Sequence, residues 1–370
     1  MGSRLKEISI RGFKSIESLD GFALGPLNVL IGANGSGKSN LVDFFRLLRA
    51  MADEGLQRFV LEKGGADGFF FLGPKETPKI SARLLFGDNK YEFDLLAAAN
   101  GKLFVGDERV QYVRGGSPQP IGTGSTESQL RARRNDSPVT RLARKGVPWY
   151  VYDAVSNWVV YHFHDTSLLA RMRRDQPLRD RVQLRPEAEN IAAFLLNLRE
   201  AREQRYTMLR DTIRLIAPFF DDFVLKPESK GEVETVRLEW RQKGSDFPFQ
   251  PSQFSDGTLR FICLATALQQ PNPPATIVID EPELGLHPYA ISLLANLIEA
   301  AAEHTQVIVA TQSPTLLDHF KPETVVVVKR QEGRSIFERL DAEALREWLE
   351  EYSVGELWQK NVLQGGPSHE

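Results

Sequence analysis

Short runs of apolar residues separated by turn residues characterise the first third of the chain. These runs predict strands at 5–11, 27–31, 80–86, 91–96 and 103–113. After the second of these runs, apolar residues recur at helical spacing from Leu41 to Leu48, which predicts a helix that starts near Lys38. The polar stretch 115–135 carries almost no apolar residues and predicts a loop.

The last third of the chain alternates strands and helices with a regularity that predicts a parallel sheet covered by helices. Strands are expected at 277–280, 306–310 and 324–328, and helices at 289–302 and 314–320. The centre predicts a strand at 158–161 and a helical region at 186–216 with a break at 204–206. An acidic helix is expected at 341–352. This alternation predicts the α/β fold class.

The loop that follows the apolar run 27–31 has the composition of a nucleotide-phosphate loop. Its residues are Gly32, Ala33, Asn34, Gly35, Ser36, Gly37, Lys38 and Ser39, followed by Asn40 in the helix. Glycines let successive backbone N–H groups face phosphate oxygens, and the Lys38 ammonium can reach the β- and γ-phosphates. Ser39 supplies a hydroxyl ligand for Mg²⁺, and the positive end of the helix dipole favours an anion there. The loop predicts binding of ATP or GTP.

Two adjacent carboxylates supply the second half of such a site. The apolar strand at 277–279 is followed directly by Asp280 and Glu281. Asp280 is expected to hold Mg²⁺ from the end of the strand, and Glu281 is expected to polarise the attacking water as a general base. An apolar strand followed by two acids is only moderately specific by itself, but together with the loop at Gly32 it favours nucleotide hydrolysis.

Composition and charge limit the remaining interpretations. The 370 residues are 42% hydrophobic and 26% charged, with a net charge of −3, which is typical of a globular protein. Every apolar run is too short to cross a bilayer, so we expect a cytoplasmic protein with no membrane partner. The single cysteine, Cys263, excludes an internal disulfide, and its apolar neighbours predict a buried, inert side chain.

Basic residues gather in the central insertion at 114–185. One run holds Arg131, Arg133, Arg134, Arg141, Arg144 and Lys145, and a second holds Arg171, Arg173, Arg174, Arg179 and Arg181. Such runs can follow a nucleic-acid backbone, but a solvated loop has the same composition. In the same region His162 and His164 share one face of a strand. A metal site is one interpretation, and a structural or nucleotide-adjacent role suits two imidazoles better.

Further segments carry a family resemblance. Residues 254–260, which include Ser255, Asp256 and Gly257, resemble the signature motif of ABC-type ATPases. Residues 283–288 resemble their D-loop, and residues 310–314, with Gln312, resemble their switch region. Residues 8–16 resemble the first strand of RecF- and SMC-like members. The chain therefore resembles the RecF-, SMC- and OLD-like branch of these ATPases, and most closely the stand-alone OLD-related members.

The resemblance implies a P-loop ATPase head with an antiparallel β subdomain and an α-helical lobe. It implies an N-terminal ATPase lobe at 1–98, a central insertion and helical lobe at 99–249, a C-terminal ATPase lobe at 250–341, and a terminal helix and tail at 342–370. A long coiled coil is not expected, because no sustained heptad separates the two ATPase lobes. The stretch after Val328 is too short for a Toprim nuclease domain, so any nuclease is expected to be a separate chain.

The resemblance also implies a site shared between two chains. Ser255, Asp256 and Gly257 of one protomer would bind ATP held by the phosphate loop of the other, so ATP binding would form a homodimer. The implied catalytic residues are Glu281, Lys38 and Gln312, with ATP and Mg²⁺ as cofactors. Gln312 stands where histidine is usual; its amide can donate a hydrogen bond but carries no charge, which predicts slow hydrolysis. Gln57 is the nearest candidate for a glutamine loop.

Two functions remain open at this point. The first is a dimeric ATPase switch in DNA repair or anti-phage defence that acts on DNA or on a separate nuclease or other effector chain. The second is a nucleotide-sensing scaffold with negligible turnover that holds an effector protein inactive. A transporter ATPase subunit is disfavoured by the signature and switch sequences. Measuring ATP turnover with and without DNA separates the first two.

Overall fold

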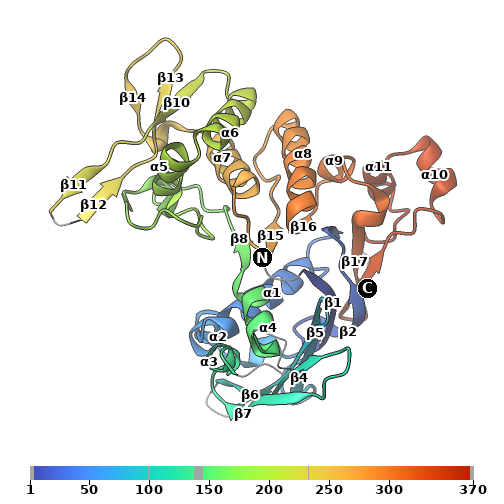
Figure 1. The fold of residues 1–370 in the computed structure, drawn as a ribbon. Helices are drawn as coiled ribbons and strands as arrows, with labels where there is room; N and C mark the ends of the chain where they lie inside the picture. Colours follow the sequence, from blue (N-terminus) through green and yellow to red (C-terminus); the bar gives the residue numbers. More distant parts are fainter. Residues whose placement is uncertain (1–3, 99–100, 137–144, 232, 367–370) are drawn as a thin grey trace. The chain divides into compact units, whose positions relative to one another are not determined.

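The computed structural model describes residues 4–98, 101–136, 145–231 and 233–366, which form two compact units (Figure 1). The first unit comprises Met1–Val160, Pro274–Val278 and Thr305–Glu370. The second comprises Tyr161–Pro273 and Ile279–His304. Both units therefore combine segments that are far apart in the sequence, and each unit is described by itself.

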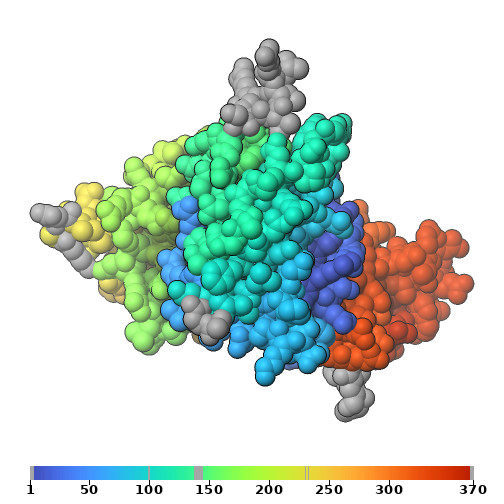
Figure 2. All heavy atoms as spheres, turned by 90° about the horizontal axis from the view of Figure 1, so that it is seen from below, coloured from blue at the N-terminus to red at the C-terminus, as the bar shows by residue number. Residues whose placement is uncertain are grey.

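An antiparallel six-stranded sheet in the order β2-β1-β4-β5-β6-β7 forms one layer of the first unit. Its strands are β1 Leu5–Phe13, β2 Ile16–Ala23, β4 Lys79–Phe86, β5 Asn89–Ala97, β6 Leu103–Tyr112 and β7 Gln119–Ser125. Burial alternates along β4 and β5, so one face of the sheet is apolar and the other polar. In the space-filling view from below, the cyan and teal atoms, in the colours of the sequence range that holds β5, β6 and β7, lie on the side of the first unit that faces the viewer (Figure 2).

Strand β7 and helix α3 (Leu130–Arg133) show that the loop predicted at 115–135 was wrong. β7 pairs with β6 in antiparallel orientation, and Ile121 and Leu130 are buried. The cause is tertiary: a polar, glycine-containing segment becomes a strand because a neighbouring edge offers hydrogen bonds, which local composition does not reveal.

A second six-stranded sheet, in the order β18-β17-β3-β16-β15-β8, carries the phosphate loop. Its strands are β3 Leu27–Ile31, β8 Trp158–Tyr161, β15 Thr276–Asp280, β16 Gln306–Thr311, β17 Val325–Gln331 and β18 Arg334–Arg339. Strand β3 pairs in parallel with β16 and β17, whereas β18 pairs with β17 in antiparallel orientation. Every residue of β3 is buried, as expected for a central parallel strand. The predicted parallel arrangement is confirmed for β3, β16 and β17.

Helix α1 (Lys38–Ala52) joins the two sheets of the first unit into one core. Its Phe44 ring contacts Phe13 and Phe93 of the antiparallel sheet, and its Phe45 ring contacts Trp158 of β8. The other helical segments of this unit are α2 Leu56–Glu62, η1 Asp67–Phe69, α4 Val147–Ser156, α9 Pro314–Leu317, η4 Pro322–Thr324, α10 Arg346–Glu351 and α11 Val354–Gln359. The helix predicted at 341–352 is thus shorter, and none of the residues of α10 is buried.

The second unit combines helices with two small antiparallel sheets. Its helical segments are η2 Arg171–Arg173, α5 Ile191–Ala201, α6 Glu203–Ile216, η3 Pro251–Gln253, α7 Asp256–Gln269 and α8 Pro288–His304. The sheets have the orders β10-β13-β14 and β11-β12-β9. Their strands are β9 Gln176–Pro177, β10 Phe220–Val224, β11 Glu228–Lys230, β12 Val233–Val236, β13 Glu239–Gln242 and β14 Pro248–Phe249. The predicted helical region breaks at Arg202, earlier than the expected 204–206.

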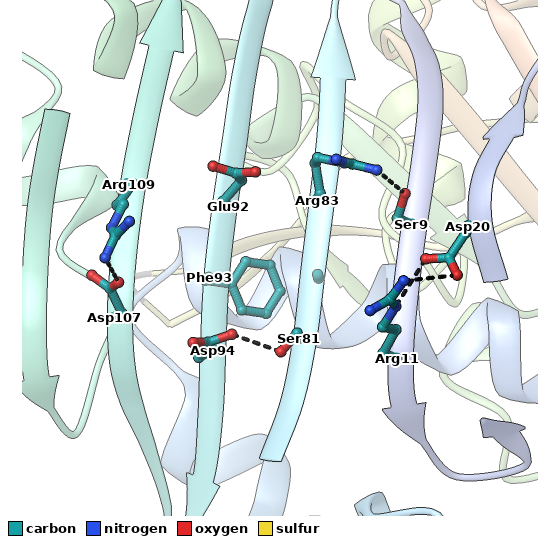
Figure 3. A pocket seen from close by; sticks show the side chains of 11 residues that line it. Ser9, Arg11, Asp20, Ser81, Arg83, Glu92, Phe93, Asp94, Asp107 and Arg109 are labelled. Carbon is teal, nitrogen blue, oxygen red and sulfur yellow. Dashed lines mark hydrogen bonds and ion pairs between the residues drawn. The ribbon is translucent and has the colours of Figure 1, made fainter. Parts of the chain in front are cut away.

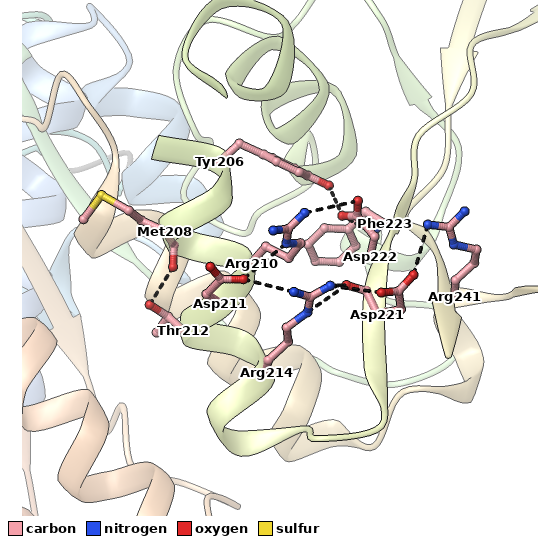
Figure 4. Close-up of polar contacts among 10 residues, drawn as sticks. All are labelled: Tyr206, Met208, Arg210, Asp211, Thr212, Arg214, Asp221, Asp222, Phe223 and Arg241. Carbon is pink, nitrogen blue, oxygen red and sulfur yellow. Dashed lines mark hydrogen bonds and ion pairs between the residues drawn. The ribbon is translucent and has the colours of Figure 1, made fainter. Parts of the chain in front are cut away.

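Ionic and aromatic contacts fasten α6 and the signature segment to the β10-β13-β14 sheet. Arg214 of α6 and Arg241 of β13 both pair with Asp221, each at 3.0 Å, and the Tyr206 hydroxyl donates to Asp222 at 2.6 Å (Figure 4). Trp240 of β13 stacks on Phe254, with ring centroids 4.6 Å apart. Phe254 immediately precedes Ser255, so this sheet supports the signature segment. In the part of the chain that the structure covers, no helix is long and apolar enough to span a membrane.

Candidate functional site

The phosphate loop is a tight turn between β3 and α1 whose backbone conformation requires glycine. Gly35 and Gly37 have φ angles of 78° and 111°, in the left-handed region. A Cβ atom on Gly37 would lie 1.9 Å from the Ser335 Oγ, so a side chain is also excluded by contact. The Lys38 Nζ donates to the carbonyl oxygens of Gly32 at 2.6 Å and Ala33 at 3.1 Å. The loop therefore curls around its own lysine.

Two serines that were not predicted, Ser15 and Ser335, hold the loop in place. Ser335 of β18 is 2% exposed, and its Oγ donates to the Ser36 carbonyl at 2.5 Å. The same Oγ lies 2.6 Å from the Ser15 Oγ, which accepts a hydrogen bond from the Asn40 Nδ2 at 2.6 Å. Sequence reasoning missed Ser335 because only the pairing of β18 brings it to the loop. Asn40, a predicted binding residue, is already tied to this hydroxyl network.

A buried carboxylate on α1 gathers positive charge beside the loop. Asp43 binds the Lys14 Nζ at 2.5 Å, Arg46 at 2.8 Å and Lys63 at 3.2 Å. Burial alone would raise the pKa of Asp43, but the hydrogen bonds and charges of these cations lower it to about 2. Asp43 is therefore ionised at neutral pH. Because three cations surround one carboxylate, the net local charge is positive, which favours an anionic ligand nearby.

The signature segment in the second unit is held from inside by Arg173. The Arg173 side chain is 4% exposed, and it pairs with the exposed Asp256 at 2.9 Å. Its Nε donates to the Thr166 carbonyl, its Nη1 to the Pro251 carbonyl, and its Nη2, which also contacts Asp256, to the Phe254 carbonyl. Arg173 is thus a buried support of the signature segment, although the sequence placed it in a basic surface run. Asp256 remains 68% exposed at its side chain while this contact fixes its position.

Ser255 begins helix α7 by capping it. Its Oγ accepts a hydrogen bond from the Thr258 N–H at 3.2 Å and lies 2.8 Å from the Thr258 Oγ1. Gly257 packs against the predicted D-loop, because a Cβ atom on it would lie 2.4 Å from the Gly285 carbonyl oxygen. The signature segment and the D-loop are therefore in backbone contact within this unit.

A second buried arginine connects α7 with the D-loop and with the segment after β8. Arg260 donates through Nε to the Phe163 carbonyl at 3.0 Å, through Nη2 to the His164 carbonyl at 3.1 Å, and through Nη1 to the Leu284 carbonyl. Burial lowers the pKa of Arg260 from its usual value. Arg260 therefore connects α7, the D-loop and the segment after β8. The sequence alone does not indicate that these three segments are in contact.

The acidic pair lies in the same unit as the signature segment. Asp280 is 9% exposed, and its backbone carbonyl lies 2.9 Å from the His164 Nε2. Glu281 has a φ of 43°, a left-handed conformation that non-glycine residues adopt infrequently and that often marks a functional position. The rings of His162 and His164 are in contact, with centroids 4.3 Å apart and planes tilted by 54°. Among the described residues, no group of three or more His, Cys, Asp or Glu side chains is arranged to hold a metal ion.

The predicted site residues are divided between the two units. Gly32 to Asn40 and Gln312 belong to the first unit, whereas Ser255 to Gly257, Asp280 and Glu281 belong to the second. Gln312 lies between β16 and α9, and the next residue, Ser313, caps α9 by accepting from the Leu316 N–H at 3.1 Å. The Gln57 amide donates to the Leu103 carbonyl at 2.8 Å, which ties it to strand β6.

The basic runs are partly neutralised. Arg131 pairs with Glu54 at 3.5 Å, Arg133 pairs with Asp136 at 3.6 Å, and the Arg134 guanidinium lies over the Tyr152 ring. In the second run, Arg171 and Arg181 pair with Glu187 and Glu200. Arg141 and Arg144 lie outside the described residues. These contacts weaken the nucleic-acid interpretation of the described arginines.

The polar face of the antiparallel sheet contains a hollow of about 350 Å³ (Figure 3). Positive and negative side chains alternate across it: Arg11 pairs with Asp20 at 2.9 Å, and Arg109 pairs with Asp107. Asp94 accepts from the Ser81 hydroxyl at 2.7 Å. Since the charges offset one another, this hollow has no strong preference for an anion or a cation.

Comparison with known proteins identifies a family model that matches this chain and solved structures with a similar fold. A family model described as "AAA domain, putative AbiEii toxin, Type IV TA system" matches residues 27–112 and 131–318, which is most of the chain. A search of curated proteins finds no match. An SMC head bound to the C-terminal winged-helix domain of ScpA is a similar solved structure, with 17% identity and a TM-score of 0.58 over 93% of this chain and 99% of that one. An SMC head with an extended coiled coil, bound to the C-terminal domain of ScpA from Pyrococcus furiosus, has 15% identity and a TM-score of 0.53 over 94% and 99%. These similarities confirm the predicted α/β fold class, with the fold of a P-loop ATPase head.

Proposed function

The chain belongs to this AAA-domain family, and we propose that it binds and hydrolyses ATP as a homodimeric switch of the RecF- and OLD-like ABC type. The observation that carries the proposal is the phosphate loop. Its left-handed glycines, its enclosed lysine and its position at the start of α1 are what a triphosphate requires. No side chain caps α1, so this helix lacks the internal hydrogen bond that Ser255 gives α7.

The residues present also fit a magnesium–nucleotide complex. Ser39 and Asp280 are the proposed Mg²⁺ ligands, since hydroxyl and carboxylate oxygens are the donors that this ion takes. Bound Mg²⁺ would neutralise charge on the phosphates. Lys38 would contact the β- and γ-phosphates, Glu281 would take a proton from the attacking water, and Gln312 would orient the γ-phosphate by donating a hydrogen bond. The left-handed backbone of Glu281 supports a special role for this carboxylate.

The proposal assigns Ser255, Asp256 and Gly257 to the nucleotide of the partner protomer. Asp256 combines an exposed carboxylate with a buried anchor, which is the arrangement expected of a residue that must meet another molecule in a fixed position. The four-part division at 98, 249 and 341 remains our proposal for the domains.

We further propose that the switch acts in DNA repair or anti-phage defence, on DNA or on a separate nuclease or other effector chain. The main support is the resemblance of the sequence motifs to RecF- and OLD-like ATPases. The basic runs add little support for DNA binding, because their described arginines are largely paired. A nucleotide-sensing scaffold with negligible turnover is the second candidate. The uncharged Gln312 at the switch position favours it.

The decisive experiment complements two defective variants. Ser255→Arg should still bind ATP as a monomer but should lose ATP-dependent dimerisation and hydrolysis, and Lys38→Ala should lose ATP binding. Mixing the two should restore turnover, because one composite site then has an intact loop and an intact signature segment. Ser252→Arg, at an exposed position just before the signature segment, is the matched control and should behave as the parent. Light scattering and phosphate release measure both effects, and a Ser255→Arg chain that dimerises and hydrolyses normally would contradict the proposal.

Glu281→Gln distinguishes the switch from the scaffold. The variant keeps the shape of the side chain but cannot accept a proton, so it should bind ATP and Mg²⁺ and accumulate as a closed dimer. If the parent chain has no turnover above Glu281→Gln, with or without DNA, the scaffold is the better description.

A further inference from the structure

The C-terminal segment from Ser353 to Gly366 touches both the phosphate loop and the element that follows Gln312. All of these contacts lie within the first unit. At one end, the Gly365 carbonyl accepts a hydrogen bond from the Ala33 N–H at 3.3 Å. At the other end, the Gly355 N–H donates to the Asp318 Oδ1 at 2.6 Å. Asp318 directly follows α9, whose first residue is only two positions after Gln312.

Both ends of the segment are closely packed. A Cβ atom on Gly365 would lie 2.4 Å from the Trp358 ring and 2.6 Å from a Val327 methyl. A Cβ atom on Gly355 would lie 2.4 Å from the Pro314 carbonyl oxygen. Between these glycines, Leu357 is fully buried and Leu363 is 6% exposed. The segment is therefore anchored along its length by apolar contacts.

We propose that residues 353–366 form a positioning strap that fixes Gln312 relative to the phosphate loop. Each end of the strap restricts the motion of a functional element through one hydrogen bond. Gly365 restrains Ala33, the second residue of the loop, and Gly355 restrains the helix that begins after Gln312. Gly355, Asp318 and Gly365 act through these elements and are positioning residues. The proposal rests on the proposed ATPase function, which it deepens by adding a determinant that no motif includes.

Enzyme kinetics can test the two ends of the strap separately, because one end contacts the phosphate loop and the other contacts the helix after Gln312. Gly365→Ala should displace the tail from Ala33, loosen the phosphate loop and raise KM for ATP by about fivefold with a smaller change in kcat. Gly355→Ala should shift α9 and with it Gln312, so kcat should fall by about fivefold with a smaller change in KM. A purely structural role would instead lower the active fraction in both variants and leave KM unchanged. Gly68→Ala is the matched control, because nothing lies within 4 Å of a Cβ atom there.

Asp318 supplies a test that does not alter a glycine. Asp318→Asn retains an oxygen that can accept from the Gly355 N–H and should preserve kcat, whereas Asp318→Ala removes the acceptor and should reproduce the Gly355→Ala defect. Equal activities of the two Asp318 variants would overturn the role of this contact, and thermal unfolding shows that each variant is folded.

Amide hydrogen exchange in the nucleotide-free full-length chain tests the strap without relying on ATP turnover. Gly365→Ala should increase exchange at the amides of residues 32–40, and Gly68→Ala should not. Unchanged exchange at these amides would overturn the strap even if the parent hydrolyses ATP. If the parent shows no hydrolysis while exchange responds as expected, the strap stands and the proposed ATPase function fails.

Discussion

The phosphate loop and the signature segment are both short turns that lead into a largely buried helix, yet the chain stabilises them in different ways. The loop before α1 depends on backbone geometry: left-handed glycines, carbonyl contacts to Lys38 and small hydroxyls from Ser15 and Ser335. The segment before α7 depends on large side chains: buried Arg173 and Arg260 fix its backbone and that of the D-loop. The difference predicts which kind of substitution damages each region.

Gly37→Ala should have the largest effect, because the phosphate loop tolerates no side chain there. The Cβ would collide with Ser335, and the left-handed φ of 111° adds strain for alanine. We expect ATP affinity to fall by more than about tenfold, measured by calorimetry. Gly35→Ala is the matched control: its φ of 78° imposes similar strain, but nothing lies within 4 Å of its Cβ. Equal losses in the two variants would mean that strain, and not the Ser335 contact, shapes the loop.

Arg260→Gln is the corresponding change in the second unit. Its effect should be smaller, and it should lower stability and hydrolysis rather than ATP affinity. It removes donors from the Phe163 and Leu284 carbonyls in a buried setting, which should cost about 2–3 kcal/mol of stability. Hydrolysis should fall while ATP affinity stays near that of the parent, because the phosphate loop belongs to the other unit. The matched control is Arg241→Gln, whose ion pair with Asp221 is partly exposed and should contribute less. An Arg260→Gln chain with parental stability and turnover would remove this arginine from the description of the site.

The comparison also explains what the sequence could predict. The strand–loop–helix order around Gly32 and the acidic end of β15 are local, so glycine spacing and apolar runs were enough to find them. The predicted strands 27–31 and 158–161 match β3 and β8, because short apolar runs of this length are consistent with buried strands.

The supports of the site were not predictable in the same way. Ser335, Arg173 and Arg260 reach the loop or the signature segment from distant parts of the chain, and an arginine that is buried looks in sequence like one that is solvated. Strand β7 was missed for a related reason, since its pairing with β6 is supplied by the sheet and not by its own composition.

A third prediction concerns the charge cluster beside the loop and has the smallest expected effect. Asp43 has a pKa of about 2 in the folded chain, below the ordinary value of about 3.9 for aspartate, because its contacts with Lys14, Arg46 and Lys63 outweigh the effect of burial. Folding therefore favours the ionised carboxylate. Its contribution to stability, about 2 kcal/mol, is fully present above the ordinary pKa and is lost as the pH falls toward 2.

Asp43→Asn removes the charge and keeps the shape, so it should lower the free energy of unfolding by about 2 kcal/mol at pH 7. The difference between parent and variant should narrow once the pH falls below about 4, since the unfolded parent chain then binds a proton at Asp43 while the folded chain does not until the pH approaches 2. Urea unfolding at a series of pH values measures this difference. Asp20→Asn is the control, because Asp20 pairs with Arg11 on the exposed sheet face and should contribute less. If the difference in the free energy of unfolding between parent and Asp43→Asn stays constant from pH 7 to pH 3, the three cations contact Asp43 without stabilising its charge. The positive surroundings of the phosphate loop would then need another explanation.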